Sequence, residues 1–443
     1  MAAFAESSDM LKRVVANVAL LLGGKAAAGL MTAGAIALMA RALDPASVGV
    51  LALLHAYVIT LRGLLNLRLV ESIVHYGVLL LDRGDLPALR QLLRFTDRTD
   101  HLTSLIAAVL GIVLAPLLGP MLGWQPEHDQ LAMWYSATLL FSANNSSQGV
   151  LRICDRFDLL GWSMTLGPLI RLLGSALAFV LTPTIAAFAT AMVLGLTVEF
   201  VITNVFGRHV RKQRIAAQSG EQPGVGPTVR ELFPDLRQFV TVVYAQNTLD
   251  MLPKQISTLL AGVLLGPAGA ALFQIARELA NVLAKPVVML RQAVFPDLTR
   301  LWQRDEHGFR RLYLRLTALL GAPALGLVAL TWIFGGAGLR YSLGADYEVA
   351  ANLLTLLMLA SAIELMAATM RPAGYAVNKA PEMLRIQVFS MVLYVALFLG
   401  LTPWLALKGP GIAACVATVL GFIGTVRVVG AAVNARLRQL SQA

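Results

Sequence analysis

The chain has 443 residues, of which 57% are hydrophobic and 14% charged, and its formal net charge is +11. Soluble domains carry about 25% charged residues, so this composition excludes a single aqueous core and indicates a membrane protein. The two cysteines are too few for a disulfide framework and do not form a CxxC motif, which excludes a cysteine-based metal or redox site.

Long apolar runs such as "LTSLIAAVLGIVLAPLLGPMLG" reach the roughly 20 residues that a helix needs to cross about 30 Å of hydrocarbon. The runs are continuous and do not alternate, which favours helices over a β-barrel. We therefore predict an all-α polytopic membrane protein of about twelve transmembrane helices, with no cleaved signal peptide. The expected spans are 14–40, 47–67, 99–122, 131–151, 161–182, 185–206, 238–263, 268–294, 313–336, 349–370, 384–406 and 409–432.

One hydrophilic connection, 208–237, is longer than the others and is rich in Gly, Pro and charged residues, which is typical of a linker. It divides the spans into six and six. We predict an N-terminal six-helix lobe at 1–207, a cytoplasmic linker at 208–237 and a C-terminal six-helix lobe at 238–443.

The positions of Lys and Arg beside the spans predict the orientation, because cytoplasmic connections carry an excess of both. The connections on one side of the membrane hold only three, Arg41, Arg340 and Lys408, while the opposite side holds most of the others. Both termini are therefore expected in the cytoplasm. This asymmetry and the anionic lipid headgroups account for much of the basic charge, so no nucleic-acid partner is required.

A similar corner follows the first span of each predicted lobe: "ALDPASVG", with Pro45, and "LLGPAGA", with Pro267. Proline ends a helix and the small residues permit a tight reversal, so each stretch is expected to form a helical hairpin corner. Equivalent corners in two halves of equal span number indicate an internal duplication, with the two copies related by an axis along the membrane normal. The sequence thus predicts a two-lobed transporter with a cleft between its lobes.

Several charged residues fall inside the predicted spans, where each costs at least about 2.5 to 3.5 kcal/mol without a cavity or partner. Counted from the span ends, Lys25, Arg171 and Arg277 lie near one depth on three helices. Spans 7 and 8 each carry a polar stripe at helical spacing. The stripe of span 7 consists of Asn247, Asp250, Lys254 and Ser257. The stripe of span 8 consists of Gln274, Arg277, Glu278, Asn281 and Lys285.

The interior charges suit an anionic substrate, since seven cations, including Arg291, outnumber four acids. The expected substrate-binding cations are Lys25, Arg171, Arg277, Lys254, Arg62 and Lys285. The acids, expected in ion coupling or charge balance, are Asp250, Glu278, Glu364 and Glu199. Two alternatives remain open: Asp250 and Lys254 as a structural pair, and snorkelling of the cations nearest the span ends.

We find no catalytic constellation. The six histidines have no metal-ligand spacing, P-loop and HExxH motifs are absent from the sequence, and the outer connections are short. We therefore predict no enzymatic activity, no metal and no cofactor, and expect transport to be driven by an ion gradient or by the substrate's own gradient.

The stretches "LMARALDPASVGVLAL", "DMLPKQISTLLAGVLLGPAGAALFQIARELA" and "VFPDLTRL" resemble the multidrug/oligosaccharidyl-lipid/polysaccharide (MOP) exporter superfamily. With the twelve-span plan they resemble its polysaccharide-export branch, the Wzx-type flippases. The chain departs from the family at Asp44, where the first corner usually has Gly.

The resemblance implies a MATE-like bundle in the bacterial inner membrane. Such a protein flips an undecaprenyl pyrophosphate-linked oligosaccharide, a repeat unit of O-antigen, capsule or exopolysaccharide, from the cytoplasmic to the periplasmic leaflet. It also implies cavity cations for the pyrophosphate, and polymerase or export proteins as possible partners. The alternatives are a cation-coupled multidrug or small-molecule antiporter, a flippase for the peptidoglycan precursor lipid, and a membrane enzyme of cell-envelope assembly.

Overall fold

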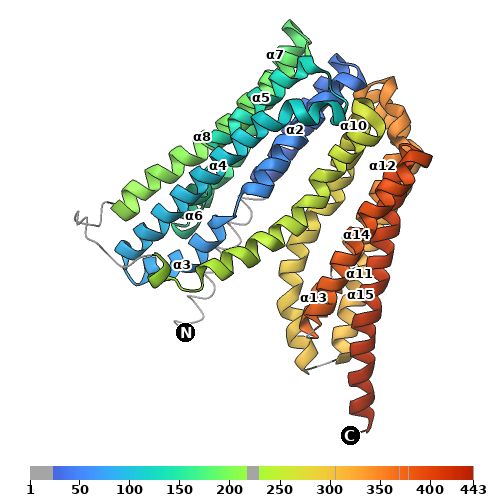
Figure 1. Cartoon of the computed structure of the whole chain (residues 1–443). Coiled ribbons are helices and arrows are strands. Elements are labelled where there is room, and N and C mark those ends of the chain that lie inside the picture. The colour runs from blue at the N-terminus through green and yellow to red at the C-terminus, as the bar shows by residue number, and fades with distance from the viewer. Residues whose placement is uncertain (1–22, 217–228, 305, 369, 378, 443) are drawn as a thin grey trace. The chain divides into compact units, whose positions relative to one another are not determined.

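The computed structural model describes residues 23–216 and 229–442, apart from positions 305, 369 and 378 (Figure 1). Every regular element in these ranges is a helix, which confirms the predicted all-α class. The chain forms two compact units. Unit 1 holds the residues up to Leu43 and Val50–Leu259, and unit 2 holds Asp44–Gly49 and Leu260–Ala443. The predicted lobe boundaries at 207 and 238 remain a prediction.

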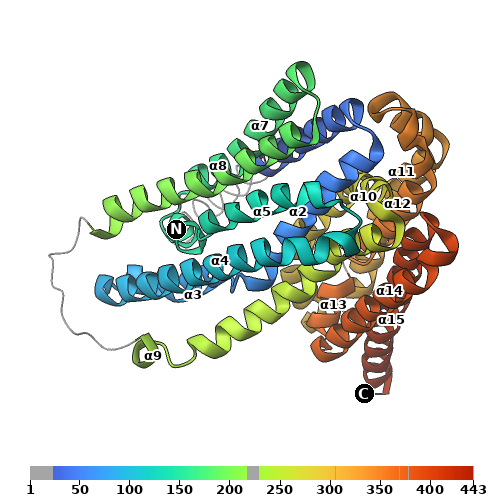
Figure 2. The same cartoon turned by 45° about the horizontal axis from the view of Figure 1, so that its top comes forward.

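The helices of unit 1 pack as long neighbours, with α7 against α8 and α4 against α5 (Figure 2). Its long helices are Gly23–Ala42, α2 Pro45–Leu65 from Val50 onward, α3 Leu69–Asp82, α4 Leu86–Leu122, α7 Phe157–Leu181, α8 Ile185–Arg211 and the first part of α10 Leu236–Arg304. Its short helices are η1 Pro126–His128, α5 Asp129–Ala137, η2 Thr138–Phe141, α6 Asn145–Ile153, η3 Lys212–Ala216 and α9 Val229–Leu232.

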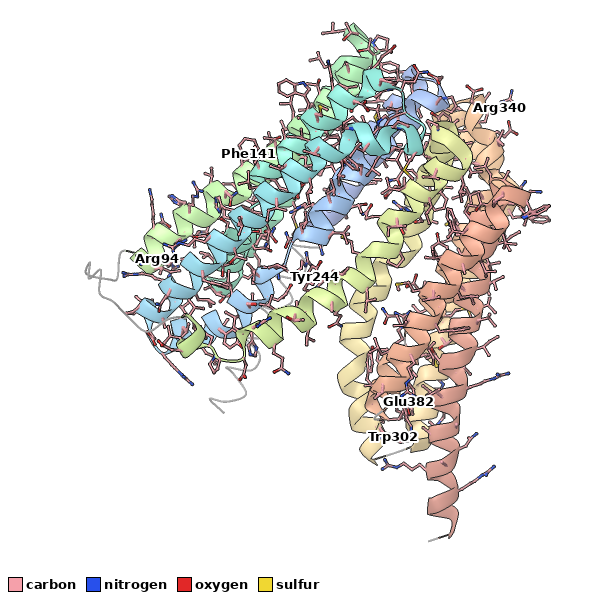
Figure 3. The ribbon with its side chains drawn as sticks, in the orientation of Figure 1. Arg94, Phe141, Tyr244, Trp302, Arg340 and Glu382 are labelled. Carbon is pink, nitrogen blue, oxygen red and sulfur yellow. The ribbon has the colours of Figure 1, made fainter. Side chains whose placement is uncertain are left out.

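Unit 2 contains the second part of α10 and four other long or medium helices, with α14 against α15 and α11 against α12. These elements are α11 Glu306–Leu343, η4 Ala345–Ala350, α12 Ala351–Met366, α13 Met370–Ala376, α14 Ala380–Leu405 and α15 Lys408–Gln442. Trp302 and Glu382 lie toward one end of this unit and Arg340 lies at the other (Figure 3), as the predicted alternation of connections requires.

Ten helices within the described ranges are long and apolar enough to cross a membrane. Predicted span 4 is absent from this set because it is divided into α5, η2 and α6, each too short to span. Predicted spans 7 and 8 lie together in α10, which leaves helical geometry at Gly266, with φ 72° and ψ 179°. The count of twelve remains a prediction.

The two corners have different local chemistry. Asp44 caps the start of α2: its carboxylate accepts the backbone N–H groups of Ala46 at 3.0 Å and Ser47 at 3.2 Å, and the Ser47 hydroxyl at 2.5 Å. At the second corner Gly266 has a positive φ, which glycine adopts without strain, and the ribbon of α10 turns back there (Figure 1). Asp44 therefore replaces the usual glycine with a helix cap.

The outer surface of the helices is apolar. Trp332 is 74% exposed on α11, and Leu117 and Met121 are 64% and 63% exposed on α4. Exposed side chains of this size form a continuous apolar surface only where lipid covers them. The fold is thus built for a membrane, and its polar groups gather inside each unit.

Candidate functional site

The polar stretch "SANNSS", at 142–147, interrupts predicted span 4. Here η2 ends and α6 begins, and the side chains are nearly inaccessible: Ser142 is 3% exposed, Asn144 2% and Asn145 3%. Backbone that leaves a helix inside a membrane must find its hydrogen-bond partners within the protein. A discontinuous helix of this kind therefore marks an internal polar site.

Asp100 of α4 supplies those partners. Its Oδ2 accepts the Asn145 backbone N–H at 2.8 Å, and its Oδ1 accepts a hydrogen bond from Asn145 Nδ2, also at 2.8 Å. The same Nδ2 donates to Asn66 Oδ1 at 3.0 Å, between α2 and α3. Asp100 is 3% exposed, so a buried carboxylate joins α4 to the start of α6, and the Asn145 amide also joins α6 to Asn66.

Arg62 of α2 lies beside this carboxylate. Its guanidinium sits 4.4 Å from the centre of the Phe200 ring and within electrostatic range of Glu199 and Asp100. Its Nε is buried and has no hydrogen-bond partner in the described part of the chain. A small cavity of about 10 Å³ adjoins these groups, and Arg62, Asn66, Asp100, Ser104 and Ser142 are among its lining residues. The arginine is thus incompletely satisfied at the edge of an internal space.

Arg171 and Glu199 lie where α7 and α8 approach closely. A Cβ on Gly195 would be 2.9 Å from Arg171 Cβ, and a Cβ on Gly167 would be 2.8 Å from Glu199 Cβ. Two glycines therefore bring these charged side chains to the same helix contact. Unit 1 thus gathers Arg62, Arg171 and Glu199 from three helices.

Tyr135 of α5 completes this group of buried polar residues. It is 1% exposed, its hydroxyl lies 2.5 Å from His55 Nδ1, and it is within electrostatic range of Arg171 and Glu199. The hydrogen-bonded pair of His55 and Tyr135 therefore belongs to the same buried polar group as Arg171 and Glu199.

Lys25 lies elsewhere in unit 1. It is exposed on the helix Gly23–Ala42, whose Gly24 lies against Gly161 and whose Gly34 lies against Leu172. Arg171 is adjacent to Leu172, so the helix register separates it from Lys25 by nine residues, or about 13 Å at 1.5 Å per residue. The expected shared depth of Lys25 and Arg171 is therefore not observed, because the two predicted spans do not begin at the same level.

Arg277 is held in unit 2 by polar and aromatic neighbours. Its Nη2 donates to Gln274 Oε1 at 2.7 Å, and Gln274 Nε2 donates to Glu278 Oε1 at 3.4 Å. The guanidinium lies 5.8 Å from the Phe273 ring and within electrostatic range of Glu278 and Tyr394. Three residues of the predicted stripe, Gln274, Arg277 and Glu278, are thus connected to one another along α10.

The other predicted site residues receive less support. Glu364 is half-buried on α12. The side chains of Asp250, Lys254 and Lys285 lie outside the described residues. Within the described part of the chain, no group of three or more His, Cys, Asp or Glu side chains is arranged to hold a metal.

Asp100 changes the predicted charge balance. Among described side chains, the predicted cations Lys25, Arg62, Arg171 and Arg277 are matched by as many acids once Asp100 joins Glu199, Glu278 and Glu364. The described interior charges are therefore balanced and do not by themselves favour an anionic substrate. Asp100 is engaged by Asn145, which leaves Arg62 incompletely paired.

Comparison with known proteins identifies the family. A family model described as "Polysaccharide biosynthesis protein" matches residues 99–352, more than half of the chain. The chain belongs to this family. The relative "Inner membrane protein YghQ" of Escherichia coli (strain K12) is 26% identical over 330 residues, which cover 73% of this chain and 90% of the relative.

Solved structures show the same fold. An inward-facing multidrug resistance MATE family transporter of the MOP superfamily aligns with a TM-score of 0.70 at 17% identity, over 91% of this chain and 95% of the other. Lipid II flippase MurJ, in an inward closed conformation, aligns with a TM-score of 0.65 at 13% identity, over 93% and 87%. The predicted MATE/MOP-like fold is confirmed, and the ten described helices that are long and apolar enough to cross a membrane agree with the predicted multi-pass membrane location.

Proposed function

We propose that the protein flips an undecaprenyl pyrophosphate-linked oligosaccharide between the leaflets of the inner membrane. Family membership and the MOP fold support a flippase linked to polysaccharide biosynthesis. The structural observation that carries the proposal is Arg62, whose buried Nε lacks a hydrogen-bond partner among the described residues beside an internal cavity.

A buried arginine with an unpaired N–H group is suited to bind an oxyanion. A planar guanidinium presents several N–H donors in one plane, which match the oxygens of a phosphate or a sugar acid. We propose that Arg62 and Arg171 in unit 1 and Arg277 in unit 2 contact the anionic part of the substrate in turn as the transporter changes conformation. We propose the same role, contact with the anionic part of the substrate, for Lys25, which is exposed on its helix, and for Lys254 and Lys285.

A cation-coupled antiporter of small molecules is the second candidate. Asp100 favours it, because this buried carboxylate lines the same cavity as the hydroxyl groups of Ser104 and Ser142, and oxygen ligands of this kind suit a proton or a small cation. A peptidoglycan precursor lipid is an alternative substrate, in view of the structural likeness to a Lipid II flippase. Polymerase or export proteins remain proposed partners.

The test is complementation of a deletion strain, with radiolabelled lipid-linked oligosaccharide and exported polymer as readouts. Arg62→Ala is expected to reduce export about ten- to hundredfold, because a hydrogen bond to a charged group contributes roughly 1.5 to 3 kcal/mol. Arg62→Lys is expected to retain part of the activity, and Arg94→Ala, which removes an exposed arginine of α4, is the control. Normal glycan export by the deletion strain, with raised sensitivity to cationic drugs, would favour the antiporter.

A further inference from the structure

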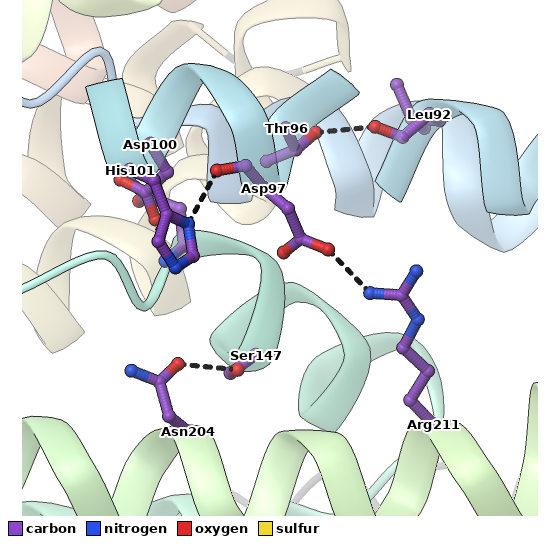
Figure 4. A network of polar contacts seen from close by, with 9 residues as sticks. Leu92, Thr96, Asp97, Asp100, His101, Ser147, Asn204 and Arg211 are labelled. Carbon is purple, nitrogen blue, oxygen red and sulfur yellow. Dashed lines mark hydrogen bonds and ion pairs between the residues drawn. The ribbon is translucent and has the colours of Figure 1, made fainter. Parts of the chain in front are cut away.

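A second polar pocket lies in unit 1 between α4, α6 and α8 (Figure 4). It has a volume of about 120 Å³, and Ser146, His101 and Arg208 are among its lining residues. Arg62, Arg171 and Glu199 do not line it. It is therefore separate from the interior charges to which we assign the transported substrate.

An ion pair and a hydrogen bond fix the walls of the pocket. Arg211 Nη1 donates to Asp97 Oδ2 at 2.6 Å, which joins α8 to α4. Ser147 Oγ donates to Asn204 Oδ1 at 2.8 Å, which joins α6 to α8. Both contacts are visible in Figure 4. The Asn204 amide is thereby oriented with its oxygen occupied and its nitrogen available as a donor.

The pocket holds one buried hydroxyl without a partner and several basic side chains. Ser146 is 5% exposed, and its buried Oγ, which can donate or accept, has no partner in the described part of the chain. His101 Nδ1 donates to the Asp97 carbonyl oxygen at 2.7 Å, so this nitrogen is already bonded within α4. Arg208 adds a second guanidinium. The charges of the two arginines and Asp97 sum to one positive charge.

The pocket lies at the expected level of lipid headgroups. Asp97 and His101 flank residue 99, where the third span is predicted to begin, and Arg208 follows residue 206, where the sixth is predicted to end. Next to it on the same helix faces are exposed apolar side chains: Leu105 is 50% exposed, one turn beyond His101, and Val205 is 56% exposed, one turn before Arg208. A ligand in the pocket therefore has lipid-facing surface directly beside it.

We propose that this pocket binds the phosphodiester of an anionic phospholipid from the leaflet at the arginine-rich end of unit 1. One phosphodiester carries one negative charge, equal and opposite to the charge of the pocket. Its oxygens accept hydrogen bonds from Ser146, Asn204 and Arg208, and its acyl chains lie on the apolar surface formed by Leu105 and Val205. Basic pockets between membrane helices hold anionic headgroups in this way. The proposal does not depend on which substrate is transported.

The test measures lipid binding to the purified full-length protein in detergent, by thermal unfolding against added lipid. Phosphatidylglycerol is expected to raise the melting temperature saturably, and phosphatidylcholine or inorganic phosphate at the same concentration is expected to raise it much less. Arg208→Gln is expected to raise the half-saturating phosphatidylglycerol concentration about tenfold or more, and Ser146→Ala about two- to tenfold. Arg94→Gln removes one positive charge from α4 outside the pocket. It is expected to change the half-saturating phosphatidylglycerol concentration by less than about twofold.

Ser146→Ala distinguishes a ligand role from a structural one. The Ser146 hydroxyl has no partner among the described residues, so its removal is expected to leave the melting temperature without lipid unchanged. A weaker response to phosphatidylglycerol at an unchanged lipid-free melting temperature supports the proposal. An unaltered response in both Arg208→Gln and Ser146→Ala overturns it, as does equal stabilisation by phosphatidylcholine. Equal stabilisation by inorganic phosphate would assign the pocket to a free anion and would also overturn the lipid proposal.

Discussion

Asp100 accepts hydrogen bonds from both the backbone and the side chain of Asn145, and so caps the start of α6 from a neighbouring helix. Asn144, at the position where a side-chain cap is usual, makes no such bond. The break in predicted span 4 is therefore stabilised by tertiary structure, and its stability depends on a single carboxylate.

Replacing Asp100 by Ala is expected to destabilise the protein by about 3 to 5 kcal/mol. The change removes two hydrogen bonds to a charged acceptor and leaves two buried donors of Asn145 with fewer partners. The measurement is thermal or denaturant unfolding of the purified protein in detergent. Asp100→Asn retains one acceptor oxygen, so this variant is expected to lose less stability than Asp100→Ala.

Asp82→Ala is the matched control, since Asp82 is exposed at the end of α3 and surface substitutions usually change stability by less than about 0.5 kcal/mol. Equal stability of Asp100→Ala and Asp82→Ala would show that the break in span 4 does not need this cap.

The helical class and both corners could be predicted from the sequence, because long apolar runs and Pro-containing turns are local signals. The break at 142–147 has an equally local signal: a string of Ser and Asn inside an apolar run predicts a discontinuous helix. The predicted span 131–151 nevertheless runs through this stretch. Asp100 was missed because it lies at the edge of a predicted span, where an acid is ordinarily solvated.

The register between helices had no local signal. Counting residues from span ends placed Lys25 and Arg171 at one depth, but helix contacts at Gly24 and Gly34 set a different register. Close approach of two helices depends on which faces carry glycine and on what those faces meet. These are properties of pairs of helices, and a single apolar run does not contain them.

Gly49 of α2 is packed directly against Pro267 of the second corner. A Cβ on Gly49 would overlap the carbonyl carbon and oxygen of Pro267, and backbone atoms cannot rotate away as a flexible side chain can. Gly49→Ala is therefore expected to destabilise the fold by about 1 to 3 kcal/mol through overpacking. Unfolding in detergent is the measurement.

The contrast is Gly338→Ala on α11, where the added Cβ would meet nothing within 4 Å. This variant is expected to be unchanged or stabilised by up to about 1 kcal/mol, since Ala is the better helix former. Equal effects at both glycines would mean that the two corners are not in contact.

The cap at Asp44 predicts a dependence of stability on pH. Hydrogen bonds from the Ser47 hydroxyl and from backbone N–H groups lower the pKa of Asp44 below its ordinary value. The ionised Asp44 cap therefore contributes its full stabilisation of the fold above the unfolded-state pKa of about 3.9. This contribution is lost as the pH falls through the lower folded-state pKa.

At pH 7, Asp44→Ala is expected to lose about 1 kcal/mol, the usual contribution of an N-cap, and Asp44→Asn to lose much less because its amide oxygen still caps. Below about pH 4 the stability of the wild type is expected to fall toward that of Asp44→Ala. Parallel curves for the wild type and Asp44→Asn down to pH 3 would contradict the assignment.

Single cysteines at the two corners test the predicted orientation. In a background with Cys154 and Cys415 replaced by Ser, a thiol at Ala46 or Ala268 is expected to react with an impermeant maleimide added outside spheroplasts. Arg94→Cys, at an exposed position on the predicted cytoplasmic side, is expected to react only after lysis. The reverse pattern would place both termini in the periplasm.

Variants of Arg277 distinguish a role in substrate binding from a structural role in charge balance. Its guanidinium bonds Gln274 and lies within electrostatic range of Glu278 in unit 2. If Arg277 binds the anionic substrate, Arg277→Ala is expected to lower glycan export about ten- to hundredfold at normal membrane abundance, and Arg277→Lys to recover part of it.

An architectural Arg277 predicts a different result. Its loss would remove a cation that lies within electrostatic range of Glu278, so abundance and melting temperature would fall, and Arg277→Ala with Glu278→Gln would restore them. The wild type and the three variants are compared by export, membrane abundance and melting temperature in one strain. Wild-type export by an abundant Arg277→Ala protein would remove Arg277 from the substrate path, and restoration of both export and stability by the second substitution would assign it to charge balance alone.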